Sequence, residues 1–106
     1  MAEAAEGDGT VLTLAAARQH LRLSASTPDS AIAELIVAAE ERIASFLGRQ
    51  ELVGETGWES ADAVPRLVVH CTKLALSDFF VNREAPELTD DQLRPMIGRH
   101  MMLSVG

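Results

Sequence analysis

The chain's three histidines and single cysteine are the side chains whose types best suit metal binding or nucleophilic catalysis. His20, His70 and His100 fall in three separate predicted helices, and none has the histidine partner four residues away that binds zinc in metalloproteases. His70 directly precedes Cys71, but adjacent residues of a helix point in different directions, which argues against a Cys–His nucleophile pair. We therefore predict no metal ligand and no cysteine nucleophile.

Two other patterns invite a comparison with catalytic sites. The stretch "GDGT" at residues 7–10 lacks the lysine and the preceding strand of a phosphate-binding loop. Glu40 and Glu41 are neighbours on the solvated side of a predicted helix, not a facing pair of carboxylates suited to acid–base catalysis. The sequence thus offers no catalytic constellation, and we expect neither enzyme activity nor a cofactor.

The densest polar cluster is "VNREAP" at residues 81–86, where an amide, a guanidinium and a carboxylate follow a long apolar segment. One interpretation is a polar helix end, because Asn82 suits a helix C-terminus and Arg83 complements the negative end of the helix dipole. The alternative is a contact between subunits, in which Arg83 binds a neighbouring carboxylate through two hydrogen bonds. We therefore treat Asn82, Arg83 and Glu84 as candidate subunit-interface residues.

The amino-acid composition restricts the fold class and the functions that this chain can have. Hydrophobic residues make up 47% of the 106 residues and aromatic residues only 4%, so the core must consist mainly of Leu, Ile, Val and Ala, which favours helices. The net charge of −7 argues against binding to nucleic acid phosphates or to anionic membranes. No signal peptide and no apolar run of about 20 residues is evident. We therefore expect a soluble protein whose compartment is a reducing cytoplasm.

Hydrophobic periodicity predicts an all-α fold, a small bundle of about four helices. A disordered N-terminal tail over residues 1–10 precedes a single helical domain over residues 11–106. Within this domain we expect two long antiparallel central helices, over residues 29–48 and 65–82. A short helix from residue 13 precedes them, and a C-terminal helix opens near residue 89.

Local signals mark several ends of these helices. Thr13 and Thr27 are predicted N-caps, and Pro28 suits the first turn that follows. Gly48 is a natural C-terminal stop. Thr89, followed three residues later by a glutamine, forms the capping-box pattern.

The only tryptophan, Trp58, lies in a glycine-containing loop over residues 49–63. It either covers an edge of the core or is exposed as an anchor for a partner, since exposed tryptophans often contribute much of a binding energy. We include Trp58 among the candidate subunit-interface residues. A short hairpin is a further possible feature of this loop.

The C-terminal segment is too apolar to remain in water, and it contains a proline, Pro95, that should kink or restart the last helix. The segment either packs on the core of the same chain or docks on another chain, a role that suits the adaptable side chain of methionine. The candidate residues for docking on another chain are Met96, Arg99, Met101 and Met102.

A helix-turn-helix that reads DNA is an alternative use of the first two helices, with "SASTPDS" as the turn. The first turns of the helix after it contain Asp29, Ser30 and Glu34. Arg, Asn or Gln would be needed there to contact bases. The pattern therefore disfavours direct readout of DNA.

Three segments, in this order and spacing, resemble the small head–tail connector proteins of long-tailed phages, also called head-completion or adaptor proteins. "TLAAARQHLRLSASTPDSAIAELIVAAEERIASFLGR" resembles the family's opening, with its His-Leu-Arg, an acidic spacer and a long helix that ends in Leu-Gly-Arg. "VPRLVVHCTKLALSDFFVNREA" resembles the second long helix, and "LRPMIGRHM" loosely resembles the closing segment. The resemblance covers about residues 11–103.

The resemblance implies a structural virion protein without enzyme activity. Such proteins form a homo-oligomeric ring, usually a dodecamer, that binds the portal protein at the capsid vertex and a tail or stopper (head-closure) protein below. DNA passes through the lumen of the ring without specific binding. We therefore expect assembly in the host cytoplasm and a final location at the head–tail interface of the virion, with no membrane contact. The alternative is a DNA-binding component of a phage packaging machine, similar to a small terminase subunit.

Overall fold

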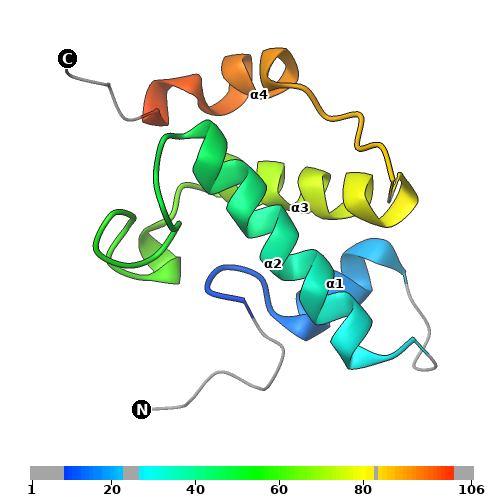
Figure 1. Cartoon of the computed structure of the whole chain (residues 1–106). Coiled ribbons are helices and arrows are strands. Elements are labelled where there is room, and N and C mark those ends of the chain that lie inside the picture. The colour runs from blue at the N-terminus through cyan, green and yellow to red at the C-terminus, as the bar shows by residue number, and fades with distance from the viewer. Residues whose placement is uncertain (1–8, 23–26, 83, 102–106) are drawn as a thin grey trace.

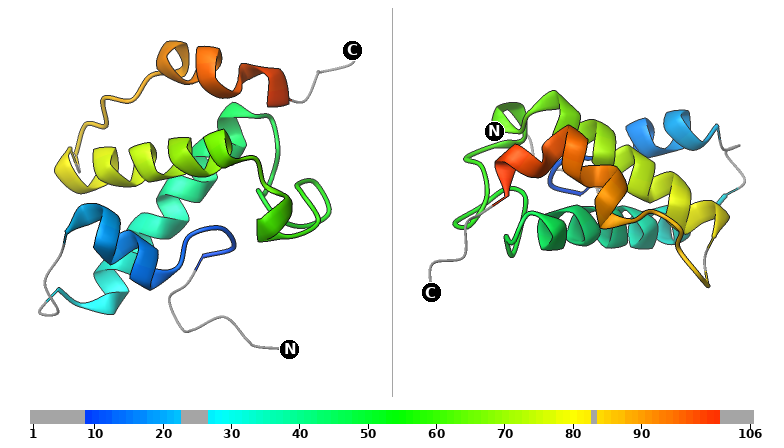
Figure 2. Two further views of the ribbon diagram at one scale, coloured as in Figure 1. Left: turned by 180° about the vertical axis from the view of Figure 1, so that it is seen from behind. Right: turned by 90° about the horizontal axis from the view of Figure 1, so that it is seen from above.

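The computed structural model describes residues 9–22, 27–82 and 84–101, and the described part of the chain is helical (Figure 1). In order, its elements are α1 (Leu14–Leu21), α2 (Asp29–Phe46), the 3₁₀ turn η1 (Ala61–Ala63), α3 (Arg66–Val81), α4 (Asp90–Ile97) and the 3₁₀ turn η2 (Gly98–His100). α2 forms one broad face of the molecule, and α1 and α3 lie on the opposite face (Figure 2). The long helices α2 and α3 cross while running in opposite senses, which confirms the predicted all-α bundle.

The core fills the space between α2 and α3 and is closed at its edges by α1 and α4. On α2 the buried residues recur with helical spacing, so a single stripe faces α3. Thr72, a buried polar residue of α3, donates its hydroxyl to the Val68 carbonyl oxygen at 2.8 Å and so leaves no unsatisfied group. The fully buried residues include Ala17, Ile32, Ile36, Ala39, Ile43, Leu47, Val68, Cys71, Leu76, Leu93 and Ile97.

Three of the predicted helix ends are confirmed. The Thr13 hydroxyl accepts a hydrogen bond from the Ala16 N–H at 3.0 Å, which caps α1. Gly48 adopts a φ of 73° beyond the end of α2, and the Arg49 N–H then bonds back to the Ala44 carbonyl at 2.9 Å. This is the Schellman geometry, for which glycine is favoured because it lacks a Cβ. The capping box of Thr89 is formed in full at the start of α4.

Two details of the helix boundaries differ from the prediction. Pro28 itself is the N-cap of α2, and no side chain caps this end, so the assignment of Thr27 as the cap was wrong. The first residue of α2, Asp29, complements the helix dipole and forms an ion pair with Arg18 of α1. Pro95 lies within α4 without ending it, and the change to 3₁₀ geometry comes only at Gly98.

Glu40 of α2 fastens the segment before α1 to the bundle. Its carboxylate accepts hydrogen bonds from the Thr10 N–H at 3.1 Å, the Thr10 hydroxyl at 2.7 Å, and the Val11 and Leu12 N–H groups, both at 2.9 Å. Gly9 lies so close that an added Cβ would collide with this carboxylate and with Ile36. The prediction of a solvated Glu40 was therefore wrong. Gly9 and Thr10 are held to the bundle, whereas residues 1–8 of the predicted tail lie outside the described residues.

Replacing Glu40 by Gln should destabilise the fold by about 2 kcal/mol, because the amide nitrogen would face backbone N–H donors and leave them unsatisfied. Urea unfolding followed by circular dichroism measures this loss. Glu41→Gln is the matched control, because Glu41 is the exposed neighbour on the same helix and surface changes of this kind have effects within about 0.5 kcal/mol. Equal unfolding midpoints for the two variants would contradict a stabilising role for Glu40.

Candidate interaction site at the α3–α4 junction

Asp78, in the last turns of α3, organises the segment that contains the Asn-Arg-Glu sequence. Its carboxylate accepts hydrogen bonds from the backbone N–H groups of Glu87 and Leu88, both at 2.9 Å. The Asn82 side-chain amide donates to the same carboxylate at 3.0 Å. A single aspartate therefore ties the end of α3 to the chain that leads toward α4.

Arg42 of α2 also binds the segment that connects α3 to α4. Its guanidinium donates to the Leu88 carbonyl oxygen at 3.2 Å and to the Asp90 carboxylate at 2.8 Å. Burial alone would raise the pKa of Asp78 above its ordinary value near 3.8. The hydrogen bonds that this carboxylate accepts and the positive charge of Arg42 outweigh burial, so the pKa of Asp78 is lowered.

The candidate residues of this junction differ in whether their side chains are engaged within the chain or exposed. Asn82 caps α3 and its side chain is engaged with Asp78, which fits the interpretation as a polar helix end. Glu84 is exposed, and Arg83 lies outside the described residues. Beside them, Val81 is 74% exposed and borders a shallow hollow of about 530 Å³ that is also lined by Phe80 and Glu87. The exposed residues that the structure describes at this junction are thus apolar or acidic.

Trp58 belongs to an internal cluster at the other end of the bundle. The Arg49 guanidinium lies over its ring, 4.2 Å from the centroid, and the His100 ring meets it edge-on at 5.9 Å. Arg49 also donates to the carbonyl oxygens of Thr56 at 3.1 Å and His100 at 3.3 Å. The loop that contains Trp58 has one isolated bridge to Val53 and no hairpin among the described residues. Trp58 therefore covers an edge of the core and links the loop to η2.

The C-terminal candidates divide between core and surface. Met96 is half-buried and packs against the core, with its sulfur 4.0 Å from the Cys71 sulfur. Arg99 is exposed, Met101 is 37% exposed, and Met102 lies outside the described residues. Core packing thus applies to Met96, whereas Met101 lies at the surface and docking through it stays a prediction.

The groups best suited to chemistry are kept apart in the fold. His20 bonds to the Ser77 hydroxyl at 2.8 Å, His100 contacts Trp58, and His70 is exposed. Burial raises the pKa of the Cys71 thiol, which disfavours the reactive thiolate. Within residues 9–22, 27–82 and 84–101, no group of three or more His, Cys, Asp or Glu residues is arranged to hold a metal ion.

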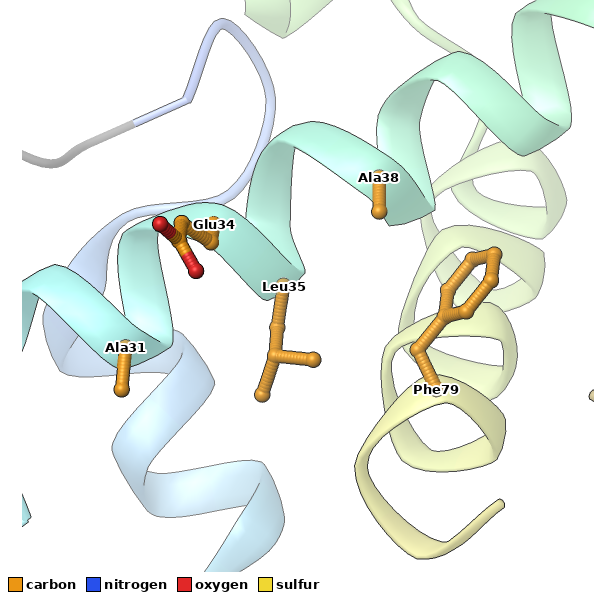
Figure 3. A pocket seen from close by; sticks show the side chains of 5 residues that line it. All are labelled: Ala31, Glu34, Leu35, Ala38 and Phe79. Carbon is orange, nitrogen blue, oxygen red and sulfur yellow. The ribbon is translucent and has the colours of Figure 1, made fainter. Parts of the chain in front are cut away.

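A shallow pocket between α2 and the C-terminal part of α3 also lacks reactive groups (Figure 3). Its volume of about 240 Å³ is smaller than the roughly 300–1,000 Å³ typical of small-molecule sites. Glu34 is the single charged residue among those that line it, and the others are Ala31, Leu35, Ala38 and Phe79. This pocket is therefore smaller than a typical small-molecule site and offers few polar groups to orient a substrate.

Comparison with known proteins agrees with this reading of the surface. The family model for the phage gp6-like head–tail connector protein matches residues 11–99, nearly all of the described helical bundle. The chain belongs to the phage gp6-like head–tail connector family. No curated protein and no solved structure matches the chain.

The match establishes the connector as a structural component of a phage particle, whose partners are other components of the head or tail. It confirms the resemblance drawn from the order of the sequence motifs. In the described part of the connector, no helix is both long and apolar enough to cross a membrane.

The lowered pKa of Asp78 gives a pH-dependent prediction. Since its folded-state pKa lies below the unfolded value, ionised Asp78 stabilises the connector above about pH 3.8, and this contribution is lost as the pH falls through the folded-state pKa. Asp78→Asn should therefore lower stability at neutral pH and flatten the loss of stability on acidification below 3.8. Urea midpoints across this pH range test it, with exposed Asp62→Asn as control. An unchanged acid profile in Asp78→Asn would contradict the assignment.

Proposed function

We propose that residues 11–106 act as a single helical adaptor domain that assembles into a ring, with twelve copies as the expected number, beneath the portal protein. The ring extends the DNA channel at the capsid vertex and presents a platform for a tail or stopper (head-closure) protein. The observation that carries this proposal is the connector-family match across residues 11–99, which spans all four helices. In this proposal, the host cytoplasm is the site of assembly.

The charge of the chain supports the passage of DNA without binding. The net charge is −7, and the exposed residues of the first turns of α2 include Asp29 and Glu34. Carboxylates repel the phosphates of DNA, so a ring of chains that each carry this net negative charge leaves DNA mobile in its lumen. The same exposed acids disfavour a DNA-reading role for α2 and with it the small-terminase-like alternative.

Electron microscopy of the connector mixed with portal rings tests the proposal. We expect additional ring density on one end of the portal. If no density forms across a range of protein concentrations and salt conditions, the adaptor role is wrong. A salt-sensitive shift of DNA in a gel would then favour a DNA-binding role instead.

The two described methionines of the candidate docking set provide a matched pair of variants. Met96→Ala should lower the free energy of unfolding by about 1–3 kcal/mol, because a half-buried side chain is removed from the core. Met101→Ala should leave stability unchanged and weaken portal binding, because Met101 is exposed. Urea unfolding and a portal pull-down separate the two effects. Full portal binding by Met101→Ala would remove this residue from the docking surface.

A further inference from the structure

The outward stripe of α2 combines an exposed apolar residue with carboxylates that have no partner in the described chain. Glu34, Val37 and Glu41 follow one another at helical spacing along the exposed side of α2, where Glu34 also borders the pocket of Figure 3, and Val37 is 54% exposed. Neither Glu34 nor Glu41 forms an ion pair or side-chain hydrogen bond with another described residue. We call these three residues the acidic face.

The start of α3 presents the opposite charge on the opposite side of the molecule. Arg66 and His70 are exposed, Lys73 is half-exposed, and Leu67 beside them is 41% exposed. The side chains of Arg66 and Lys73 also form no ion pair or hydrogen bond within the described chain. We call these four residues the basic face.

The position of Arg66 is unfavourable for the isolated chain. It is the first residue of α3, where the helix dipole favours negative charge, and no acidic residue lies in this first turn. α2 and α4, by contrast, both begin with aspartate. A negatively charged partner from another chain would offset this unfavourable interaction with the helix dipole.

We propose that the acidic face of one copy docks on the basic face of a second copy, with Val37 against Leu67 at the centre. This inference rests on the proposed ring and names the surfaces that form it. The two faces lie on opposite sides of the bundle, because α2 and α3 bury their inner sides against each other (Figure 2). Such a contact is head-to-tail, the type that closes into a ring when its rotation permits.

A second copy fits these surfaces better than other occupants do. Each face carries the charge that the other lacks, and each has one large exposed apolar residue beside its charges. A symmetric dimer through either face would place like charges opposite each other, which is repulsive. Charge complementarity therefore selects the alternating, head-to-tail arrangement.

Disulfide trapping tests this contact even when the free protein is mainly monomeric. A mixture of Val37→Cys and Leu67→Cys chains, oxidised together, should form a mixed dimer, and the double variant should form a ladder of oligomers. Wild type measures the background, because its only cysteine, Cys71, is buried. A mixture of Val37→Cys with Ala15→Cys is the matched control, since Ala15 is exposed on α1 and lies outside both faces and outside the α3–α4 junction. Trapping at the control level, or a dominant Val37→Cys homodimer, would overturn the proposal.

A charge swap tests the polar part of the contact. Adding Glu41→Lys to the Val37→Cys chain should reduce trapping with Leu67→Cys about threefold or more, because a cation then faces Arg66. Adding Arg66→Glu to the Leu67→Cys chain should restore the trapping, because the two swapped charges are then opposite again. Circular dichroism checks that each variant is folded, and Glu55→Lys is a control in the exposed loop. No reduction, or no rescue, argues against the proposed pairing.

The outcomes separate this inference from the proposed function. Ring density on the portal without trapping between the two faces would support the adaptor role and show that the ring forms through other surfaces. Trapping and a ladder without any density on portal rings would support the contact between copies and remove the adaptor role.

Discussion

The contact between α2 and α3 is the constraint on which the rest of the structure depends. With few aromatic residues, the chain has one thin core between these helices, and the segments outside it have little apolar surface to bury. Charged side chains on the two helices hold those segments instead. Glu40 binds the loop before α1, and Asp78 and Arg42 bind the connection to α4. If α2 and α3 separated, these charged groups would lose the backbone partners that position them.

These attachments also explain why so small a domain has long irregular connections. An unpaired backbone N–H group away from water is costly, and a helix cannot satisfy the N–H groups of a neighbouring loop with its own backbone. A carboxylate accepts several hydrogen bonds at once, so one Glu or Asp fixes two successive backbone N–H groups. Arg49 serves as a donor instead of an acceptor. Its guanidinium donates hydrogen bonds to two backbone carbonyl oxygens and covers the Trp58 ring.

The sequence predicts what depends on neighbouring residues and misses what depends on distant ones. Thr13 and Gly48 act within a single helical turn, so the local sequence pattern is enough to predict both. The N-H groups bound by Glu40 lie near residue 10, far from it along the chain, so no local pattern reveals the bond. The sequence pattern likewise does not mark Asp78, although its carboxylate accepts hydrogen bonds from the Asn82 side chain and from the Glu87 N–H. The sequence does place Asn82 at the helix end, where the structure finds it.

Glu40 and Glu41 illustrate how the fold uses one charged residue within the chain and leaves its neighbour exposed. They are identical in type and adjacent in sequence, yet helical geometry turns Glu40 toward the N-terminal segment and Glu41 toward the outside. The first is satisfied within the chain, so its contribution belongs to the stability of the monomer. The second has no partner among the described residues, so folding leaves its charge available. In the proposed contact between copies, an unpaired surface charge of this second kind helps to distinguish one neighbour from another, because a wrong neighbour would leave it unpaired or repelled.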